Sequence, residues 1–232
     1  MEQGLGIAHF FAQADGVGKA VLGLLLLLSL ASWYLILTRL LANLRARRTA
    51  AACIASLRQT HSLADLRRLF AEQEQDHAFA RLIERAVEAA QEGEDAGAAA
   101  LALAGGMAEY LSRDLGSVID REAAQVDVGL TILATAGSTA PYVGLFGTVW
   151  GIYQALVQIG MSGQGTLDKV AGPVGEALIM TALGLAVAIP AVLAYNAFTR
   201  RNRVWLSQLE AFAHDLYVLL TVRASRPAPA QR

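Results

Sequence analysis

Three long apolar stretches dominate the hydropathy pattern of this chain. The first, Ala20–Leu37, holds 18 residues without a charge. The second runs from Val128 to about Met161, and the third from Val170 to Phe198 with a single charged residue. A helix rises about 1.5 Å per residue, so ~20 apolar residues cross the hydrocarbon core of a bilayer. The pattern therefore predicts three transmembrane helices, at 20–38, 128–161 and 170–198.

The second and third stretches are longer than a bilayer requires, at about 51 and 44 Å of helix. We expect them to continue as helices into the aqueous phase. Beyond the third stretch, apolar residues recur at intervals of three and four, which predicts one face of a helix at 199–222: Trp205, Leu209, Phe212, Leu216 and Leu220. The last residues, 223–232, are rich in Pro, Ala and Arg and are expected to form a disordered tail.

The region 39–127 between the first two spans has a soluble composition. Apolar residues at helical spacing predict two amphipathic helices, one around Leu63–Phe70 and one around Phe79–Val87. Gln91–Gly106 is rich in alanine, glycine and acid, which indicates a connector or a poorly packed helix. Met107–Asp127 is expected to form one helix that leads into the second span. The prediction is an all-α membrane protein with long helical extensions.

A cleaved signal peptide is the alternative interpretation of the first apolar stretch. Acidic Glu2 and Asp15 precede it, and its only basic flank is Lys19. No small-x-small cleavage site follows before Arg39. These features favour an uncleaved transmembrane helix.

Basic residues predict the orientation of the spans. Of the 19 Lys and Arg residues, only Lys19 and Lys169 lie in the segments 1–19 and 162–169. Basic residues accumulate on the cytoplasmic side of membrane proteins. We therefore expect 1–19 and the turn 162–169 outside, and 39–127 and the C-terminus in the cytoplasm. Cys53 would then be a free thiol in a reducing compartment.

The composition excludes several function classes. The chain is 55% hydrophobic and 17% charged, with mean hydropathy +0.41, so its spans are expected to contact membrane lipid. A net charge of −1 provides no basic patch for nucleic acid. One cysteine and four scattered histidines offer no metal-ligand spacing, and no phosphate-binding loop is present. We expect neither an enzyme nor a bound cofactor or metal.

Small residues mark candidate helix contacts within the spans. Membrane helices associate where small side chains let their backbones approach. The candidates are Gly144, Gly147 and Gly151 in the second span and Gly175 and Gly184 in the third. Packing inside one three-helix subunit explains many of them. Their presence on several faces also favours contacts between subunits, and hence a homo-oligomer.

Glu176 is the one acid of the third span, and it has two interpretations. An acid within lipid costs about 2.5–3.5 kcal/mol and usually marks a functional pathway. However, Glu176 follows Pro173 by three residues, which also suits an acid in a first helical turn at the membrane interface. Thr148 lies on the small-residue stripe of the second span, where its hydroxyl could simply bond its own helix backbone. Pro141 and Pro190 each allow a kink, either structural or a moving hinge.

Two motifs resemble the ExbB/TolQ/MotA family of proton-channel motor subunits. They are Gly144–Ile152 (GLFGTVWGI) and Glu176–Leu185 (EALIMTALGL), the latter followed by AIPAVLAYN. The resemblance implies a bacterial inner-membrane protein that forms a homopentamer around single-span partner helices, with its N-terminus in the periplasm. It also implies that Glu176, Thr148 and Thr181 are the polar residues of a proton pathway.

Within this family the motifs look most like the ExbB branch. That branch implies an ExbD-type partner and a TonB-type energy transducer for outer-membrane transport. The TolQ branch, which serves the Tol–Pal envelope system, is the alternative. The MotA branch usually has four spans and fits poorly. A single glutamate cannot relay protons across the whole bilayer. We expect the partner helix to supply the second titratable group.

Two other classes compete with a motor subunit. A small-molecule transporter usually shows internal repeats, and this chain has none. A passive scaffold would leave Glu176 merely interfacial. Substrate uptake by the chain alone would favour the first, and proton flux that survives loss of Glu176 would favour the second.

Overall fold

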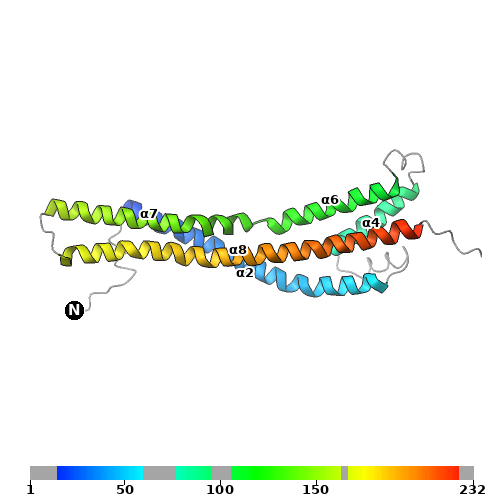
Figure 1. The fold of residues 1–232 in the computed structure, drawn as a ribbon, viewed down its shortest axis with the longest axis horizontal. Helices are drawn as coiled ribbons and strands as arrows, with labels where there is room; N and C mark the ends of the chain where they lie inside the picture. The colour runs from blue at the N-terminus through cyan, green and yellow to red at the C-terminus, as the bar shows by residue number, and fades with distance from the viewer. Residues whose placement is uncertain (1–14, 60–76, 96–105, 163–166, 225–232) are drawn as a thin grey trace, which may run out of the picture. The chain divides into compact units, whose positions relative to one another are not determined.

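The computed structural model describes residues 15–59, 77–95, 106–162 and 167–224, and within them every element is an α-helix. The helices are α2 (Gly16–Gln59), α4 (Ala78–Asp95), α6 (Met107–Asp127), α7 (Leu130–Ser162) and α8 (Leu167–Ala224) (Figure 1). The predicted all-α class is confirmed for this part of the chain.

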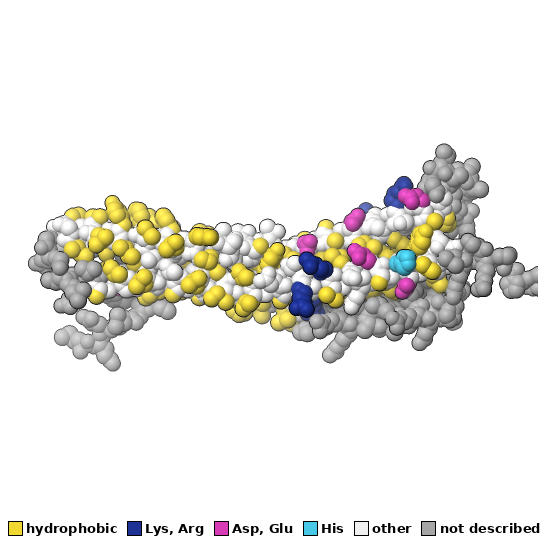
Figure 2. All heavy atoms as spheres, in the orientation of Figure 1, with side chains coloured by type: hydrophobic (Ala, Val, Ile, Leu, Met, Phe, Trp, Pro, Cys, Tyr) yellow, Lys and Arg dark blue, Asp and Glu magenta, His cyan; other side chains and the backbone are white. Residues whose placement is uncertain are grey.

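The chain divides into two compact units. The apolar unit comprises Met1–Arg39 and Gly129–Thr199, and the amphipathic unit comprises Leu40–Val128 and Arg200–Arg232. Figure 2 shows charged side chains over α4, α6 and the C-terminal half of α8, and hydrophobic ones over α7 and the N-terminal half of α8. Charge and hydropathy therefore segregate between the units.

Three helical segments are long and apolar enough to cross a membrane. They are Gly16–Leu41, Met107–Met161 and Ala171–Thr221. Their surfaces carry many exposed large apolar side chains, among them Leu27 and Tyr34 in the first segment. Such side chains are stable in contact with lipid. The prediction of three membrane-spanning helices is confirmed in this sense.

Helix α2 begins four residues before the predicted span at 20–38. Asp15 Oδ1 accepts a hydrogen bond of 2.7 Å from the Gly18 N–H, and its carbonyl accepts one of 3.0 Å from the Lys19 N–H. Aspartate is a preferred residue at this capping position because it satisfies a free N–H of the first turn. The cap therefore starts the helix at Gly16, in the segment 1–19 that was expected to precede it.

The expected continuous helix from Met107 into the second span is interrupted. Helix α6 ends at Asp127 and α7 begins at Leu130. Between them, Gly129 adopts φ +84°, a conformation open to glycine and costly for other residues. A Cβ at Gly129 would also lie 2.9 Å from Leu35 Cδ2. Helix α7 therefore starts after a glycine break, at Leu130.

Other predicted boundaries shift by a few residues. Helix α4 extends to Asp95, which places helix in the first part of the expected connector Gln91–Gly106. Helix α7 ends at Ser162 and α8 begins at Leu167, so only four residues of the expected turn 162–169 lie outside helix. The predicted helix around Leu63–Phe70, most of the tail 223–232 and the Cys53 side chain lie outside the described residues.

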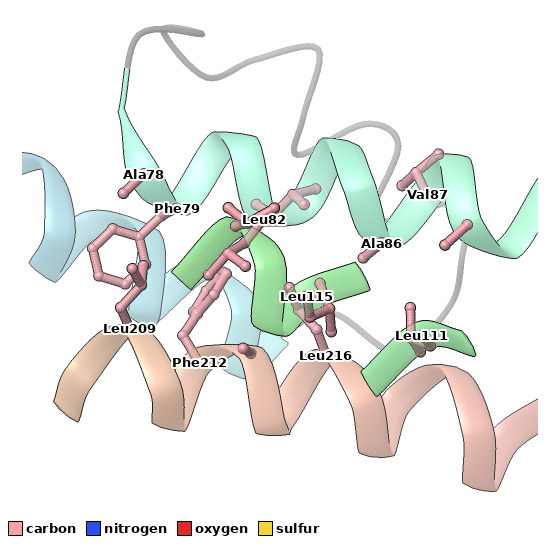
Figure 3. Close-up of a cluster of buried hydrophobic side chains, with 14 residues drawn as sticks. Ala78, Phe79, Leu82, Ala86, Val87, Leu111, Leu115, Leu209, Phe212 and Leu216 are labelled. Carbon is pink, nitrogen blue, oxygen red and sulfur yellow. The ribbon is translucent and has the colours of Figure 1, made fainter. Parts of the chain in front are cut away.

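A core of buried side chains holds the amphipathic unit together (Figure 3). Phe79 of α4 and Phe212 of α8 meet edge to face, with ring centroids 5.0 Å apart. The predicted apolar face of the last helix is confirmed, since Leu209 and Leu216 are buried and Trp205 packs against them. Burial of each such large side chain stabilises the fold by about 1.5–3 kcal/mol.

Ion pairs run along the edge of this core. Arg81 Nε lies 2.7 Å from Glu122 Oε1, whose side chain is 6% exposed. Arg85 pairs with Asp114 at 2.8 Å and with Glu88 at 2.6 Å. A buried carboxylate is tolerated only with such a partner. The Arg81–Glu122 and Arg85–Asp114 pairs therefore join α4 to α6.

Candidate functional site

Helices α7 and α8 approach each other closely at two glycines. A Cβ built on Gly144 would lie 2.6 Å from the Met180 carbonyl oxygen and 3.0 Å from Gly184 Cα. A Cβ on Gly184 would lie 2.6 Å from the Ala140 carbonyl oxygen. Any side chain here would meet the backbone of the other helix, which is the packing that small residues permit in membranes.

The contact continues along both helices in an antiparallel register. Gly137 faces Val192, Gly144 faces Gly184, and Gly151 faces Ala177, where a Cβ on Gly151 would lie 2.9 Å from Ala177 Cβ. Residue numbers rise along one helix as they fall along the other. This register places Thr148 and Thr181 opposite each other, one turn from the closest point.

The two threonine hydroxyls form a hydrogen bond between the helices. Thr148 Oγ1 lies 2.6 Å from Thr181 Oγ1, 3.0 Å from the Ala177 carbonyl oxygen and 3.2 Å from the Gly144 carbonyl oxygen. A hydroxyl has one proton to donate and two lone pairs that accept. The single Thr148 proton can therefore go to the Gly144 carbonyl of the same helix or to the Ala177 carbonyl of α8, and in both cases Thr148 accepts the bond from Thr181.

Glu176 lies at a separate polar pocket of the apolar unit. The pocket has a volume of about 170 Å³, enough for several water molecules. Glu176 is half-buried and lines this pocket together with Asp15, Trp150 and Gln154. Helix α8 begins at Leu167, nine residues before Glu176. The interpretation of Glu176 as a first-turn acid is therefore wrong.

The structure joins the pocket to the threonine pair through α8. Ala177 and Met180 line the pocket, and the Ala177 carbonyl oxygen is a partner of the Thr148 hydroxyl. Thr148 and Thr181 themselves lie outside the described lining of the pocket. Glu176 and the threonines thus occupy neighbouring positions along the α7–α8 contact.

Sequence reasoning missed the contribution of α2 to this pocket. Asp15 Oδ2 accepts a 2.7 Å hydrogen bond from Trp150 Nε1 of α7 and lies 3.5 Å from Gln154 Nε2. The second titratable group of the relay is expected from the partner helix; within this chain, the Asp15 carboxylate lines the same pocket as Glu176. Its position at the start of a span was the available signal, but its partner is 135 residues away.

The remaining predicted site residues fall into three groups. Gly147 packs between α2 and α8, where its Cβ would lie 3.0 Å from Val21 Cγ1 and 3.2 Å from Met180 Cβ. Among the residues that the structure describes, a Cβ on Gly175 would meet no atom within 4 Å. Pro141 and Pro190 lie inside α7 and α8, which continue through them.

We expect valine at Thr148 or Thr181 to weaken function if the hydroxyls order protons or water. Valine keeps a similar shape and removes the hydroxyl, so the 2.6 Å bond is lost. The loss of one such bond is worth about 0.5–1.5 kcal/mol, or up to roughly tenfold in rate. Energised import in cells measures the effect. Replacing exposed Thr139 by valine is the control, since its hydroxyl donates to the Thr135 carbonyl oxygen of its own helix.

Comparisons with known proteins agree with these features. Residues 107–211 match the model of the MotA/TolQ/ExbB proton channel family. Biopolymer transport protein ExbB of Neisseria meningitidis serogroup A is 42% identical over 210 residues, which cover 90% of this chain and 94% of that protein. Its counterpart in Xanthomonas campestris pv. campestris is 41% identical over 207 residues, covering 87% and 80%.

A second group of relatives matches less of the chain. Tol-Pal system protein TolQ of Pseudomonas aeruginosa is 45% identical over 112 residues, which cover 48% of each protein. The threonine pair and Glu176 fall inside the matched segment 107–211. The chain belongs to the MotA/TolQ/ExbB proton channel family.

Proposed function

We propose that this chain is the proton-channel subunit of an inner-membrane motor that energises TonB-dependent outer-membrane transport. The observation that carries the ExbB assignment is the extent of the similarity. Proteins named ExbB match up to 90% of the chain, whereas the TolQ protein of P. aeruginosa matches 48%. A TolQ-type role in the Tol–Pal system is the second candidate, supported by the 45% identity of that shorter match.

In this proposal protons pass through the α7–α8 contact. Glu176 takes up and releases a proton at its pocket, and the hydroxyls of Thr148 and Thr181 order protons or water beside it. Each charge that crosses the membrane potential yields about 2.3 kcal/mol per 100 mV. An ExbD-type single-span partner supplies a further titratable group, and the released energy moves a TonB-type transducer.

The assembly belongs to the same proposal. We propose a homopentamer whose copies meet at small residues that the described part of one chain leaves uncovered, of which Gly175 is an example. Pro141 and Pro190 are proposed hinges, since a proline leaves a carbonyl without its helical partner. Membrane lipid covers the remaining exposed apolar side chains of the spans.

Deletion and complementation test the assignment. We expect a strain without this chain to lose uptake of a TonB-dependent substrate, and the full chain to restore that uptake only while the proton-motive force is intact. A protonophore is the control for energy dependence. Normal uptake in the deletion strain together with an envelope defect that the chain repairs would favour the Tol–Pal role instead.

We expect the N-terminus in the periplasm and the region 39–127 in the cytoplasm. An introduced cysteine at Gln3, in a Cys53→Ala background, should react with an impermeant thiol reagent in intact spheroplasts. Native Cys53 should react only after lysis. Labelling of Cys53 in intact spheroplasts would overturn this topology.

A further inference from the structure

One carboxylate ties α2 to α7. Asp15 Oδ1 accepts the hydrogen bond from the Gly18 N–H, which starts α2, at 2.7 Å. Asp15 Oδ2 accepts the bond from Trp150 Nε1 of α7 at 2.7 Å, with Gln154 Nε2 at 3.5 Å. Each carboxylate oxygen therefore accepts a hydrogen bond from a different helix. The Asp15 side chain can link α2 to α7 because it has two acceptor oxygens.

The ring held by this bond is fixed on other sides as well. Trp150 stacks with Phe146 at a centroid distance of 6.5 Å and packs against Tyr153 at 5.8 Å. Trp150, Gln154 and Asp15 all line the pocket of Glu176. The bond thus sets the position of one wall of the pocket.

The charge of Asp15 shows whether this residue carries protons or acts as a hydrogen-bond acceptor. The hydrogen bond from Trp150 and, after it, the bond from the Gly18 N–H hold the pKa of Asp15 below its ordinary value of 3.8. The carboxylate is then ionised at neutral pH. A group that keeps its charge is a poor carrier of protons and a steady hydrogen-bond acceptor.

We infer that Asp15 is a positioning residue for proton passage: through Trp150 and Gln154 it fixes the wall that α2 and α7 build around the Glu176 pocket. This inference rests on the proposed function. It assigns to the start of the first span a role in the pathway, beyond its role in membrane insertion. Asp15 acts through Trp150, so the two residues should behave as one unit.

Asp15→Asn is the sharpest change. Asparagine still caps a helix, but it has one oxygen and places an N–H₂ donor where the second oxygen was. That donor would face either the Gly18 N–H or the indole N–H. We expect normal recovery of the complex and a fall in import of about tenfold, the scale of one charge-assisted hydrogen bond. Asp15→Glu keeps the carboxylate and should restore part of the activity.

A double-mutant cycle distinguishes positioning from a general structural effect. Trp150→Phe keeps an aromatic ring and removes the N–H, so it should match Asp15→Asn, and the double variant should be no worse than either. The indole N–H Raman band of Trp150, in a Trp33→Phe/Trp205→Phe background, should shift in Asp15→Asn. Trp33→Phe alone is the matched control for import, since exposed Trp33 lies away from the pocket.

The outcomes separate this inference from the proposed function. Additive losses in the double variant, or an unchanged Raman band, would overturn the link through Trp150. Full import by Asp15→Asn beside an inactive Glu176→Gln would overturn the inference and leave the proposed function standing. Full import by both variants would overturn both. If Asp15→Asn reduces complex recovery, the import activity of Trp150→Phe tests the inference by itself, because this variant leaves the helix cap intact. Full import by Trp150→Phe would then overturn the inference.

Discussion

Replacing Glu176 by glutamine is expected to abolish energised import while the complex still assembles. Glutamine keeps the size and the hydrogen-bonding capacity of the side chain but never binds or releases a proton. Glu176 is half-buried at a pocket that accommodates water, so the packing of α8 has little reason to change. Uptake of a TonB-dependent substrate, with complex recovery measured in parallel, gives the result.

Two variants sharpen this experiment. Glu176→Asp keeps a titratable group with a shorter reach and should retain part of the import activity. Glu210→Gln is the matched control, because exposed Glu210 lies on the same helix in the amphipathic unit. Wild-type import by an assembled Glu176→Gln complex would show that the carboxylate is only an interfacial acid.

Replacing Gly144 by alanine is expected to destabilise the apolar unit strongly. The added Cβ would lie 2.6 Å from the Met180 carbonyl oxygen and 3.0 Å from Gly184 Cα, so α7 and α8 must move apart. Overpacking of this kind costs about 1–3 kcal/mol, and here backbone rather than a flexible side chain must yield. The same shift would lengthen the bond between Thr148 and Thr181. Thermal unfolding in mild detergent measures the loss.

Gly160→Ala is the matched control in the same helix. A Cβ on Gly160 would meet no described residue within 4 Å, and alanine is the better helix former by about 1 kcal/mol. We therefore expect this variant to be as stable as the wild type or slightly more so. Equal stability of the Gly144 and Gly160 variants would contradict the close approach of α7 and α8. Because Gly144 packs within one chain, its substitution reports on the subunit rather than on contacts between copies.

The three spans could be predicted from the sequence because hydropathy is a local property. A run such as Ala20–Leu37 is apolar whatever it packs against, and length alone then indicates a membrane helix. The apolar face from Trp205 to Leu220 could likewise be predicted from its spacing, and it packs into the core of the amphipathic unit as expected. The ends of the helices were harder to predict from the sequence. The cap at Asp15 and the break at Gly129 depend on single residues whose conformations are set by their surroundings.

The pairing of side chains within the site could not be predicted from spacing. Thr148 and Thr181 meet because Gly144 and Gly184 bring two helices together, and that register is a tertiary property. Glu176 lies about 140° around an ideal helix from Thr181, so spacing alone separates them. The bond between Asp15 and Trp150 spans 135 residues of sequence. Hydropathy was sufficient to predict the helices. The pocket could be found only from the way the helices pack.

Proton flux through the purified complex is the most direct test of the central claim. The chain would be recovered with its ExbD-type partner, placed in liposomes that enclose a pH-sensitive dye, and driven by a potassium diffusion potential. The proposed pathway predicts proton flux in the wild-type complex, its loss in Glu176→Gln and its partial return in Glu176→Asp. Equal flux in the wild-type and Glu176→Gln complexes would contradict the claim that protons pass by way of Glu176.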